Sequence, residues 1–455
     1  MGGPLNDLTT VVADLTLDGT LDVTTTAGGF FAPGVYRIIS YGGTLTNNGL
    51  ALGATPLSLA LSVQTAVANQ VNLVNTTGLT LNYWDGAAGP KNNGFINGGD
   101  GVWQVAGSND NWTDITGTVN SAFSNGSFIE FMAQAGTITV DNSLGQVTAA
   151  GMQFASDGYV LSGGSITLSG APTNIIRVGD GTSSGAGYTA TINSVLAGTS
   201  SIEKHDLGTL VLAGNNTYIG GTTISGGVLQ IASDSNLGAA AGTLRLDGGT
   251  LRTTADIAMT RDTSLGSTGS TFDTQTGTLI QNGVVSGVGT LTKTGAGTLT
   301  LAGANTYSGG TALKGGQITI GNNRALGEGA LSMDEGTALG FSVSDLNVAN
   351  AIVLTSISDP VINTGAFNET LSGIISGTGA LTKEGTGTLI LSSPNTYSGP
   401  TTVAAGTLQA GAMNAFSAVS VYSVSPGATL DAAGFHQDLA GLRNAGVVSL
   451  LVTVR

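Results

Sequence analysis

The most informative absence in this 455-residue sequence is that of cysteine. Without a thiol, the chain can form neither a disulfide nor a thiolate metal site. Charged residues are scarce too, at 9% against roughly 25% in ordinary globular domains. Only 13 residues are Lys or Arg, and the formal net charge is −15. Because phosphate-binding surfaces depend on clustered basic side chains, the composition argues against nucleic acid and anionic lipid as partners.

Long apolar runs are missing as well. No stretch reaches the length of about 18 apolar residues that a bilayer requires, so the sequence predicts no transmembrane helix. The N-terminus, from Met1 to Asp7, has neither a basic segment nor an apolar core, and it therefore does not predict a signal peptide. The tail, residues 447–455, is strand-like but amounts to a single strand.

Glycine, in contrast, is abundant. There are 73 glycines among the 455 residues, about twice the average usage. The residues between them are mainly Thr, Val, Leu and Ile, which favour strands. Disorder would need low hydrophobicity together with high charge, whereas 40% of this chain is hydrophobic. We therefore expect a folded all-β chain with very frequent turns.

One segment recurs three times along the chain. The copies read GTLVLAGNNTYIGGTTISGGVLQI at 208–231, GTLTLAGANTYSGGTALKGGQITI at 297–320 and GTLILSSPNTYSGPTTVAAGTLQA at 387–410, with equivalent residues 89 and 90 positions apart. We expect Asn to turn the chain and Tyr to cover the corner. The repeated residues assigned a structural role are Lys204, Asn216, Tyr218, Lys293, Asn305, Tyr307, Lys383, Asn395 and Tyr397.

Within each copy the apolar residues alternate with polar ones, as Leu210 and Leu212 do. This period of two indicates strands, and three short strands with their turns fill roughly 22 residues, the size of one β-helix coil rather than of a propeller blade. The sequence therefore predicts a right-handed parallel β-helix, or β-solenoid. The expected shape is a single elongated rod with a small side loop or hairpin.

The regularity of the coils differs along the chain. Residues 191–455 predict a regular β-helix with three repeat units, the last one truncated, whereas residues 1–190 predict irregular coils. All three tryptophans, Trp84, Trp103 and Trp112, fall near 83–114, where the pattern suggests a loop or hairpin that leaves the helix. Exposed aromatic rings often bind sugars or proteins, so these three are candidate binding residues. The alternative is that they pack the side loop on the coils.

No catalytic, cofactor-binding or metal-binding residues are predicted. His205 would suit a hydrolytic triad, but its position is occupied by Thr294 and Glu384 in the other copies, which favours a turn residue. Asp334 and Glu335 form the one adjacent acid pair of the repeat region, and no basic residue stands beside them to abstract a proton. We expect no enzyme, and a β-helical polysaccharide lyase or hydrolase is the alternative.

The form GTLTLAGANTYSGGT resembles the autotransporter-associated β-strand repeat found in passenger regions of type V secreted proteins, over residues 194–411. The resemblance implies a shaft exposed on the outer membrane or secreted, with an adhesin or virulence role and repeats that assist secretion. It implies an outer-membrane β-barrel translocator as a partner, and a host-cell surface or extracellular matrix component as a possible one. Because neither a signal peptide nor barrel strands are visible, the chain is expected to be a fragment of such a protein.

Overall fold

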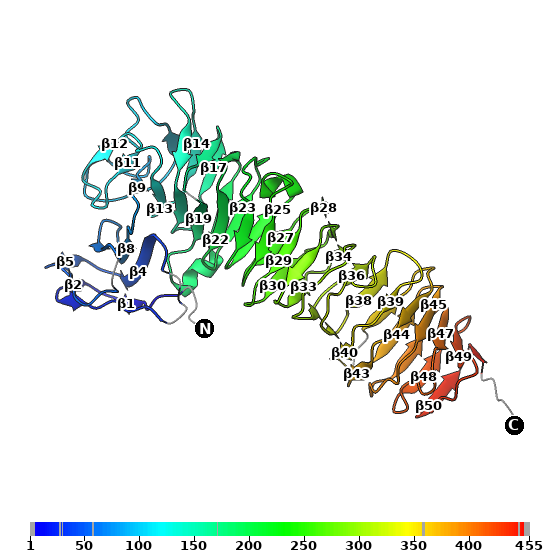
Figure 1. Ribbon diagram of the computed structural model, residues 1–455. Helices are drawn as coiled ribbons and strands as arrows, with labels where there is room; N and C mark the ends of the chain where they lie inside the picture. Colours follow the sequence, from blue (N-terminus) through cyan, green and yellow to red (C-terminus); the bar gives the residue numbers. More distant parts are fainter. Residues whose placement is uncertain are drawn as a thin grey trace. The chain divides into compact units, whose positions relative to one another are not determined.

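The computed structural model describes residues 5–26, 29, 31–56, 59–170, 172–356, 360–444 and 446–449 (Figure 1). In these ranges the chain forms short strands, no α-helix, and two 3-10 helices, η1 (Ser183–Gly187) and η2 (Asp234–Leu237). The chain divides into two compact units, Met1–Ile231 with Ser235–Gly242, and Ala232–Asp234 with Thr243–Arg455. In both units most strands pair in parallel with the strand one coil later, which confirms the predicted parallel β-solenoid.

The N-terminal part of the first unit departs from the predicted run of coils. Three parallel pairs are present, β1 with β4, β2 with β5 and β3 with β6, but β4 also pairs antiparallel with β8, and β8 with β7. Alternation of apolar and polar residues is the same in parallel and antiparallel strands, so the sequence pattern does not distinguish them. The strands are β1 (Thr9–Val11), β2 (Leu15–Leu17), β3 (Thr20–Leu21), β4 (Gly34–Tyr41), β5 (Leu45–Asn47), β6 (Ala51–Leu52), β7 (Leu61–Gln64) and β8 (Gln70–Asn75).

The rest of the first unit consists of stacked coils. One sheet contains β9 (Leu81–Trp84), β13 (Phe128–Phe131), β16 (Gly151–Phe154), β19 (Thr173–Val178), β22 (Ser201–His205) and β24 (Thr222–Ile224), extended beyond β9 by antiparallel β11 (Trp112–Thr113) and β12 (Asn120–Ser121). A second contains β10 (Gly101–Trp103), β14 (Thr137–Val140), β17 (Val160–Gly163), β20 (Thr189–Ile192), β23 (Thr209–Leu212) and β25 (Val228–Ile231). A third contains β15 (Val147–Ala149), β18 (Ile166–Leu168) and β21 (Leu196–Gly198).

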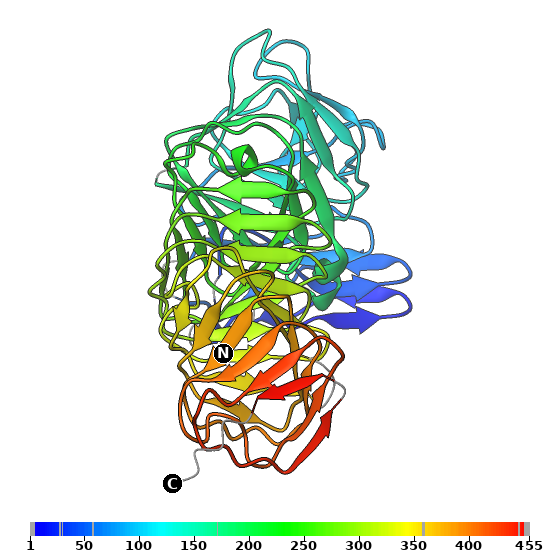
Figure 2. The same cartoon turned by 90° about the vertical axis from the view of Figure 1, so that its right-hand side faces the viewer.

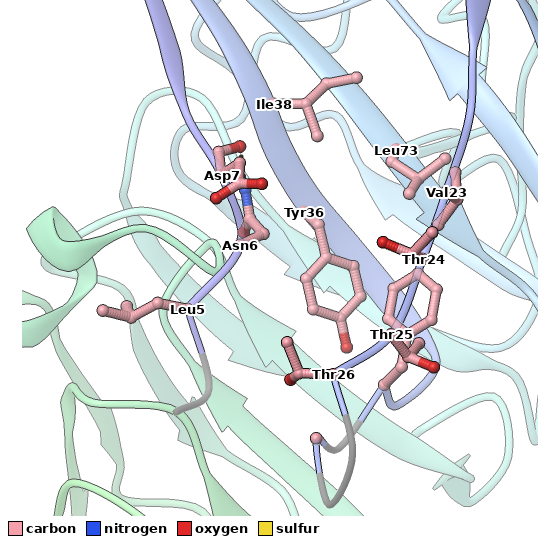
Figure 3. A pocket seen from close by; sticks show the side chains of 12 residues that line it. Leu5, Asn6, Asp7, Val23, Thr24, Thr25, Thr26, Tyr36, Ile38 and Leu73 are labelled. Carbon is pink, nitrogen blue, oxygen red and sulfur yellow. Dashed lines mark hydrogen bonds between the residues drawn. The ribbon is translucent and has the colours of Figure 1, made fainter. Parts of the chain in front are cut away.

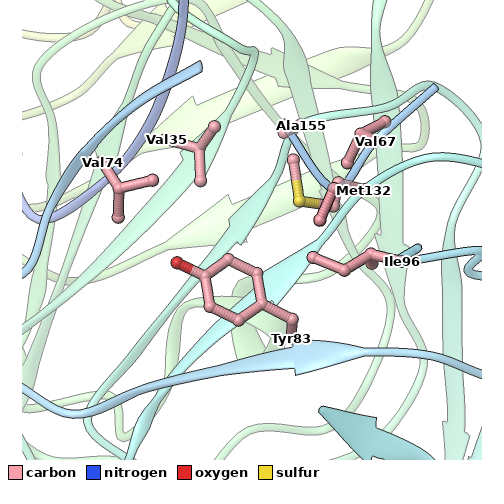
Figure 4. Close-up of a cluster of buried hydrophobic side chains, with 8 residues drawn as sticks. Val35, Val67, Val74, Tyr83, Ile96, Met132 and Ala155 are labelled. Atoms are coloured by element: carbon pink, nitrogen blue, oxygen red, sulfur yellow. The ribbon is translucent and has the colours of Figure 1, made fainter. Parts of the chain in front are cut away.

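A hydrophobic cluster holds the antiparallel strands against the first coils. Val35 of β4, Val74 of β8, Tyr83 of β9 and Met132 are all buried and pack in this cluster (Figure 4). The side chain of Gln153, in β16, adds a polar attachment, because its Oε1 accepts from Val35 N at 2.7 Å and its Nε2 donates to Val35 O at 2.8 Å. The Gln153 side chain therefore satisfies both the N–H and the C=O of Val35, which a neighbouring strand would otherwise pair.

In the second unit the coils stack as regular rungs (Figure 2). One sheet contains β26 (Leu244–Leu246), β29 (Thr263–Leu265) and β32 (Val285–Gly287), and a second contains β27 (Thr250–Thr253), β30 (Ser270–Asp273), β33 (Leu291–Thr294), β35 (Thr311–Leu313), β37 (Leu331–Met333), β40 (Ile352–Leu354) and β43 (Ile375–Gly377). A third contains β28 (Ile257–Met259), β31 (Thr278–Gln281), β34 (Thr298–Leu301), β36 (Gln317–Ile320), β38 (Ala338–Phe341), β41 (Val361–Asn363), β44 (Leu381–Glu384), β46 (Thr401–Val403), β48 (Val421–Val424) and β50 (Gly441–Asn444). A fourth contains β39 (Asn347–Val348), β42 (Glu369–Leu371), β45 (Thr388–Leu391), β47 (Thr407–Ala410), β49 (Thr429–Asp431) and β51 (Val447–Ser449).

The core of the second unit is a set of interior ladders. Leu299, Ile318, Leu339 and Ile362 stand in register on four successive coils, and each is fully buried. Parallel strands lie about 4.8 Å apart, which brings each of these side chains into contact with the one above and the one below. Burying one such side chain is worth about 1.5–3 kcal/mol, so the repeated apolar positions are the main source of coil stacking.

Acid and amide side chains at the corners connect consecutive coils. Asp157 Oδ1 accepts from the backbone N–H of Thr189 at 2.7 Å, and Asp256 Oδ1 accepts from that of Thr278 at 2.7 Å. Each bond satisfies the backbone N–H of the first residue of a strand on the next coil, β20 for Thr189 and β31 for Thr278. Much of the small acidic complement of the chain therefore has a structural use at the turns.

Candidate functional site: the repeat cluster

The repeated lysine of each copy is buried and ties two coils together. Its ammonium group donates hydrogen bonds to three backbone carbonyl oxygens, two that directly follow it and one on the next coil. For Lys293 the acceptors are Thr294 at 2.8 Å, Gly295 at 2.9 Å and Gly315 at 3.0 Å. The same pattern holds for Lys204 with the carbonyls of His205, Asp206 and Gly226, and for Lys383 with those of Glu384, Gly385 and Ala405.

The backbone conformation explains why three carbonyls converge on one ammonium. The second residue after each lysine has a positive φ, 77° at Gly295 and 83° at Gly385, and 62° at Asp206, where an acid adopts the left-handed region. On the next coil the residue that follows the third acceptor is also a left-handed glycine, as Gly316 with φ 66° shows. Left-handed turns of this kind redirect the carbonyls inward, and glycine adopts them without a steric penalty.

Burial alters the proton affinity of these amines. Removal from water lowers the pKa of Lys204 to about 7 and the pKa values of Lys293 and Lys383 to about 8, although the carboxylates of Asp206, Asp273 and Glu384 respectively oppose the effect. All three side chains are fully buried. They therefore lie within the fold and are not displayed at its surface.

The repeated asparagine spans three successive coils. Asn305 Oδ1 accepts from Val285 N at 2.8 Å, 20 residues earlier, and Asn305 Nδ2 donates to Ala325 O at 2.6 Å, 20 residues later. Asn216 and Asn395 make the equivalent pairs of bonds in their own copies. None of the three asparagines has a positive φ, and the observed role of the side chain is to bridge coils, which the sequence did not predict.

The repeated tyrosine is not a cover for the corner, as the sequence suggested, because it is fully buried. Tyr307 shares a hydrogen bond of 2.6 Å with the hydroxyl of Thr311, and Tyr218 and Tyr397 make the same bond with Thr222 and Thr401. A buried phenol needs such a partner, and burial raises the pKa of Tyr307. We call Lys, Asn, Tyr and this Thr of one copy a repeat cluster.

The three tryptophans form a core and not an exposed face. Trp84, Trp103 and Trp112 are each 0% exposed, with ring centres 5.0 Å apart for Trp84 and Trp112 and 5.2 Å apart for Trp103 and Trp112. Phe123 and Phe131 pack against them, and Trp84 Nε1 donates to the backbone oxygen of Gly99 at 2.7 Å. The arrangement matches the packing alternative, and the binding prediction has no exposed ring to support it.

A polar ladder inside the first unit was not singled out from the sequence. Glu130, Gln153 and Arg177 stand in register on three successive coils, and all are fully buried. Arg177 Nε donates to the Asp206 carboxylate at 3.0 Å, while burial raises the pKa of the Glu130 carboxyl well above its usual range and Arg177 opposes this. In the described part of the chain neither Glu130 oxygen has a hydrogen-bond partner. The only sequence signal for the ladder is a charged residue inside an otherwise apolar strand.

The residues considered for catalysis do not assemble into a site. His205 Nε2 lies 2.9 Å from the carboxylate of Glu203, with which it is paired. The fold brings Lys314 Nζ to 3.5 Å from Asp334, a basic neighbour that sequence adjacency did not show, but both side chains are well exposed. Within the described ranges, no group of three or more His, Asp or Glu side chains is placed to hold a metal ion, and no helix is long and apolar enough to cross a membrane.

A known protein family matches the segments of this chain that contain the repeat clusters. The passenger-associated-transport-repeat family covers residues 202–231, 291–320 and 381–410, and each match contains one complete cluster. The chain is also 46% identical over 413 residues to the adhesin BmaC autotransporter of Brucella suis biovar 1 (strain 1330). That alignment includes 90% of this chain but 11% of the relative, so the chain spans a small part of that protein. No solved structure matches the chain significantly.

Proposed function

From the premise that this chain carries autotransporter passenger repeats and is homologous to an autotransporter adhesin, we propose that it is a shaft segment of a surface-exposed or secreted passenger with an adhesive, non-enzymatic role. Its partners would be an outer-membrane translocator during export and a host-cell surface or extracellular matrix component afterwards. The β-helical lyase or hydrolase alternative gains no support from either match.

One observation carries the proposal: the three family matches coincide with the three repeat clusters. Each cluster uses side chains to join coils that are consecutive in sequence. The bonds of Asn305 to Val285 and Ala325 can form only when the coil before and the coil after are both in place. A chain that emerges coil by coil would therefore gain stability stepwise as each cluster is completed, which is how a repeat could assist secretion.

The secretion role is tested in the natural polypeptide that contains this segment. We would compare surface display, measured by protease accessibility on intact bacteria, for the parent, for a Lys204→Met/Lys293→Met/Lys383→Met variant, and for a deletion of residues 293–382. The deletion removes one whole repeat period and joins equivalent positions, so it is a matched control with intact clusters. Reduced display of the lysine variant beside normal display of the deletion is expected. Equal display of all three would contradict the secretion role.

The adhesive role needs a separate measurement. The purified chain, immobilised on beads, is expected to bind cultured epithelial cells or matrix-coated wells saturably, and soluble chain should compete. Heat-unfolded chain on the same beads is the control for non-specific adsorption. Binding that is no greater than this control would rule out adhesion by this segment.

A further inference from the structure

A pocket of about 200 Å³ opens in the first unit beside strand β4 (Figure 3). Residues 5–7 line one side of it and residues 23–26 line the other, with the ring of Tyr36 between them. Phe31 packs edge-on against this ring at 4.6 Å between centres. Ile38 and Leu73 complete an apolar floor. Neither the sequence motifs nor the family match includes any of these residues.

The tyrosine at the centre of the pocket is held in place from within the fold. Its hydroxyl donates to Ala32 O at 3.0 Å, and the Arg177 guanidinium lies 4.1 Å from the ring centre. Burial raises the pKa of Tyr36 to about 12, so the phenol is neutral under ordinary conditions. Tyr36 itself is 5% exposed and forms a fixed base beneath the pocket, and the half-buried Phe31 ring packed against it is the aromatic surface that a ligand can reach.

The two sides of the pocket present free hydrogen-bonding groups. Asp7, Thr24, Thr25 and Thr26 are exposed, and within the described ranges neither the carboxylate nor the three hydroxyls bonds to another protein group. These groups can thus donate to or accept from a ligand without breaking an internal bond. None of the described residues that line the pocket is basic.

We propose that this pocket binds a neutral sugar ring, such as the terminal pyranose of a glycan. The hydroxyl groups of the sugar would bond to Asp7 and to the threonine hydroxyls, while its apolar face would lie against the half-buried side chains of Val23, Phe31 and Ile38. The absence of basic residues among the described lining and the net charge of −15 disfavour phosphates and acidic sugars. The volume is below the range of roughly 300–1,000 Å³ typical for drug-sized ligands and suits a single ring.

This inference rests on the proposed adhesion, to which it adds a ligand class, and it is tested on the purified full chain. Saturation-transfer NMR with the methyl glycosides of glucose, galactose, mannose and N-acetylglucosamine should show saturable binding of at least one, with a dissociation constant on the order of 1 mM. Asp7→Asn and the double variant Thr25→Ala/Thr26→Ala should weaken that binding by about tenfold or more. The matched controls are Glu335→Gln and Thr276→Ala, which change exposed residues of the second unit.

The outcomes separate the two proposals. Because the altered side chains are exposed, unchanged thermal unfolding is expected for every variant, and circular dichroism checks this. Absence of saturation transfer to all four glycosides, or equal binding by the pocket variants and the controls, would overturn the sugar assignment. Cell binding without glycoside binding overturns the pocket proposal alone, whereas glycoside binding without cell binding overturns the adhesion alone.

Discussion

The ammonium group of Lys293 donates a hydrogen bond of 3.0 Å to the carbonyl oxygen of Gly315, a residue on the following coil. The same relationship occurs between Lys204 and Gly226 and between Lys383 and Ala405. A lysine is thus the internal connector between coils at each repeat, although a buried ammonium carries a large desolvation cost. Three carbonyl acceptors around one donor offset this cost, because hydrogen bonds to a charged group are stronger than neutral ones.

Replacing this connector should destabilise the second unit. Lys293→Met keeps the apolar stem but leaves three carbonyl oxygens without their donor, and we expect a loss of about 2–3 kcal/mol in the free energy of unfolding. Urea unfolding followed by circular dichroism measures it. Lys314→Met, at an exposed lysine, is the matched control and should change stability by less than about 0.5 kcal/mol. Equal effects of the two substitutions would contradict a connecting role.

The asparagine bridge makes a second, local prediction. Asn305→Ala leaves the N–H of Val285 and the carbonyl of Ala325 unpaired in a buried position, at a cost of about 1–3 kcal/mol for each group. Amide hydrogen exchange should accelerate at the coils before and after residue 305. Asn282→Ala, at an exposed position of the same unit, serves as the control and should leave exchange unchanged. Faster exchange confined to the coil of the mutated residue would argue against a three-coil bridge.

The raised pKa of Glu369 predicts that the free energy of unfolding depends on pH. Its Oε2 accepts from Leu346 N at 2.8 Å, but burial raises its pKa from 4.5 to about 7, and Asp345 adds to the rise. The folded state therefore holds a proton between these pH values that the unfolded state has released. The stability that this group contributes is present below pH 4.5 and is lost as the pH rises through 7.

The substitution Glu369→Gln should remove this dependence, because the amide oxygen can still accept from Leu346 and cannot ionise. Denaturation midpoints would be measured for variant and parent between pH 4 and 8. The difference between the two midpoints is expected to grow as the pH rises. Glu335→Gln, at an exposed acid of the same unit, is the control. A constant gap across the range would contradict the assignment.

The tryptophan core should tolerate truncation poorly. Trp112→Ala removes a fully buried ring that contacts Trp84, Trp103 and Phe123, and we expect a loss of about 3–5 kcal/mol. Near-ultraviolet circular dichroism and thermal unfolding should change together. Phe95→Ala, at a ring that is 47% exposed, should leave both almost unchanged. Loss of host-cell binding by Trp112→Ala at unchanged stability would instead support the tryptophans as a binding site.

Much of the fold was predictable from the sequence, and the pairing partners were not. Alternating apolar residues such as Leu299 and Leu301 mark a strand, and a recurring period marks a stack, so the solenoid and the structural nature of the repeated residues follow from the order of the amino acids. The acceptors of Lys293 are backbone carbonyls, which every residue carries. No sequence feature therefore identified them.

The sequence by itself determined the repeating solenoid, because a recurring unit of short alternating strands marks a stack of coils. It also determined the register of each coil, because a shift by one residue would turn the apolar side chains of that coil out of the core. Only the tertiary structure decided that β4 and β8 run antiparallel, that Trp84, Trp103 and Trp112 are buried, and that Tyr36 faces a pocket. These features depend on contacts between segments far apart in the chain. An aromatic residue has the same local pattern whether such a contact covers it or leaves it open to solvent.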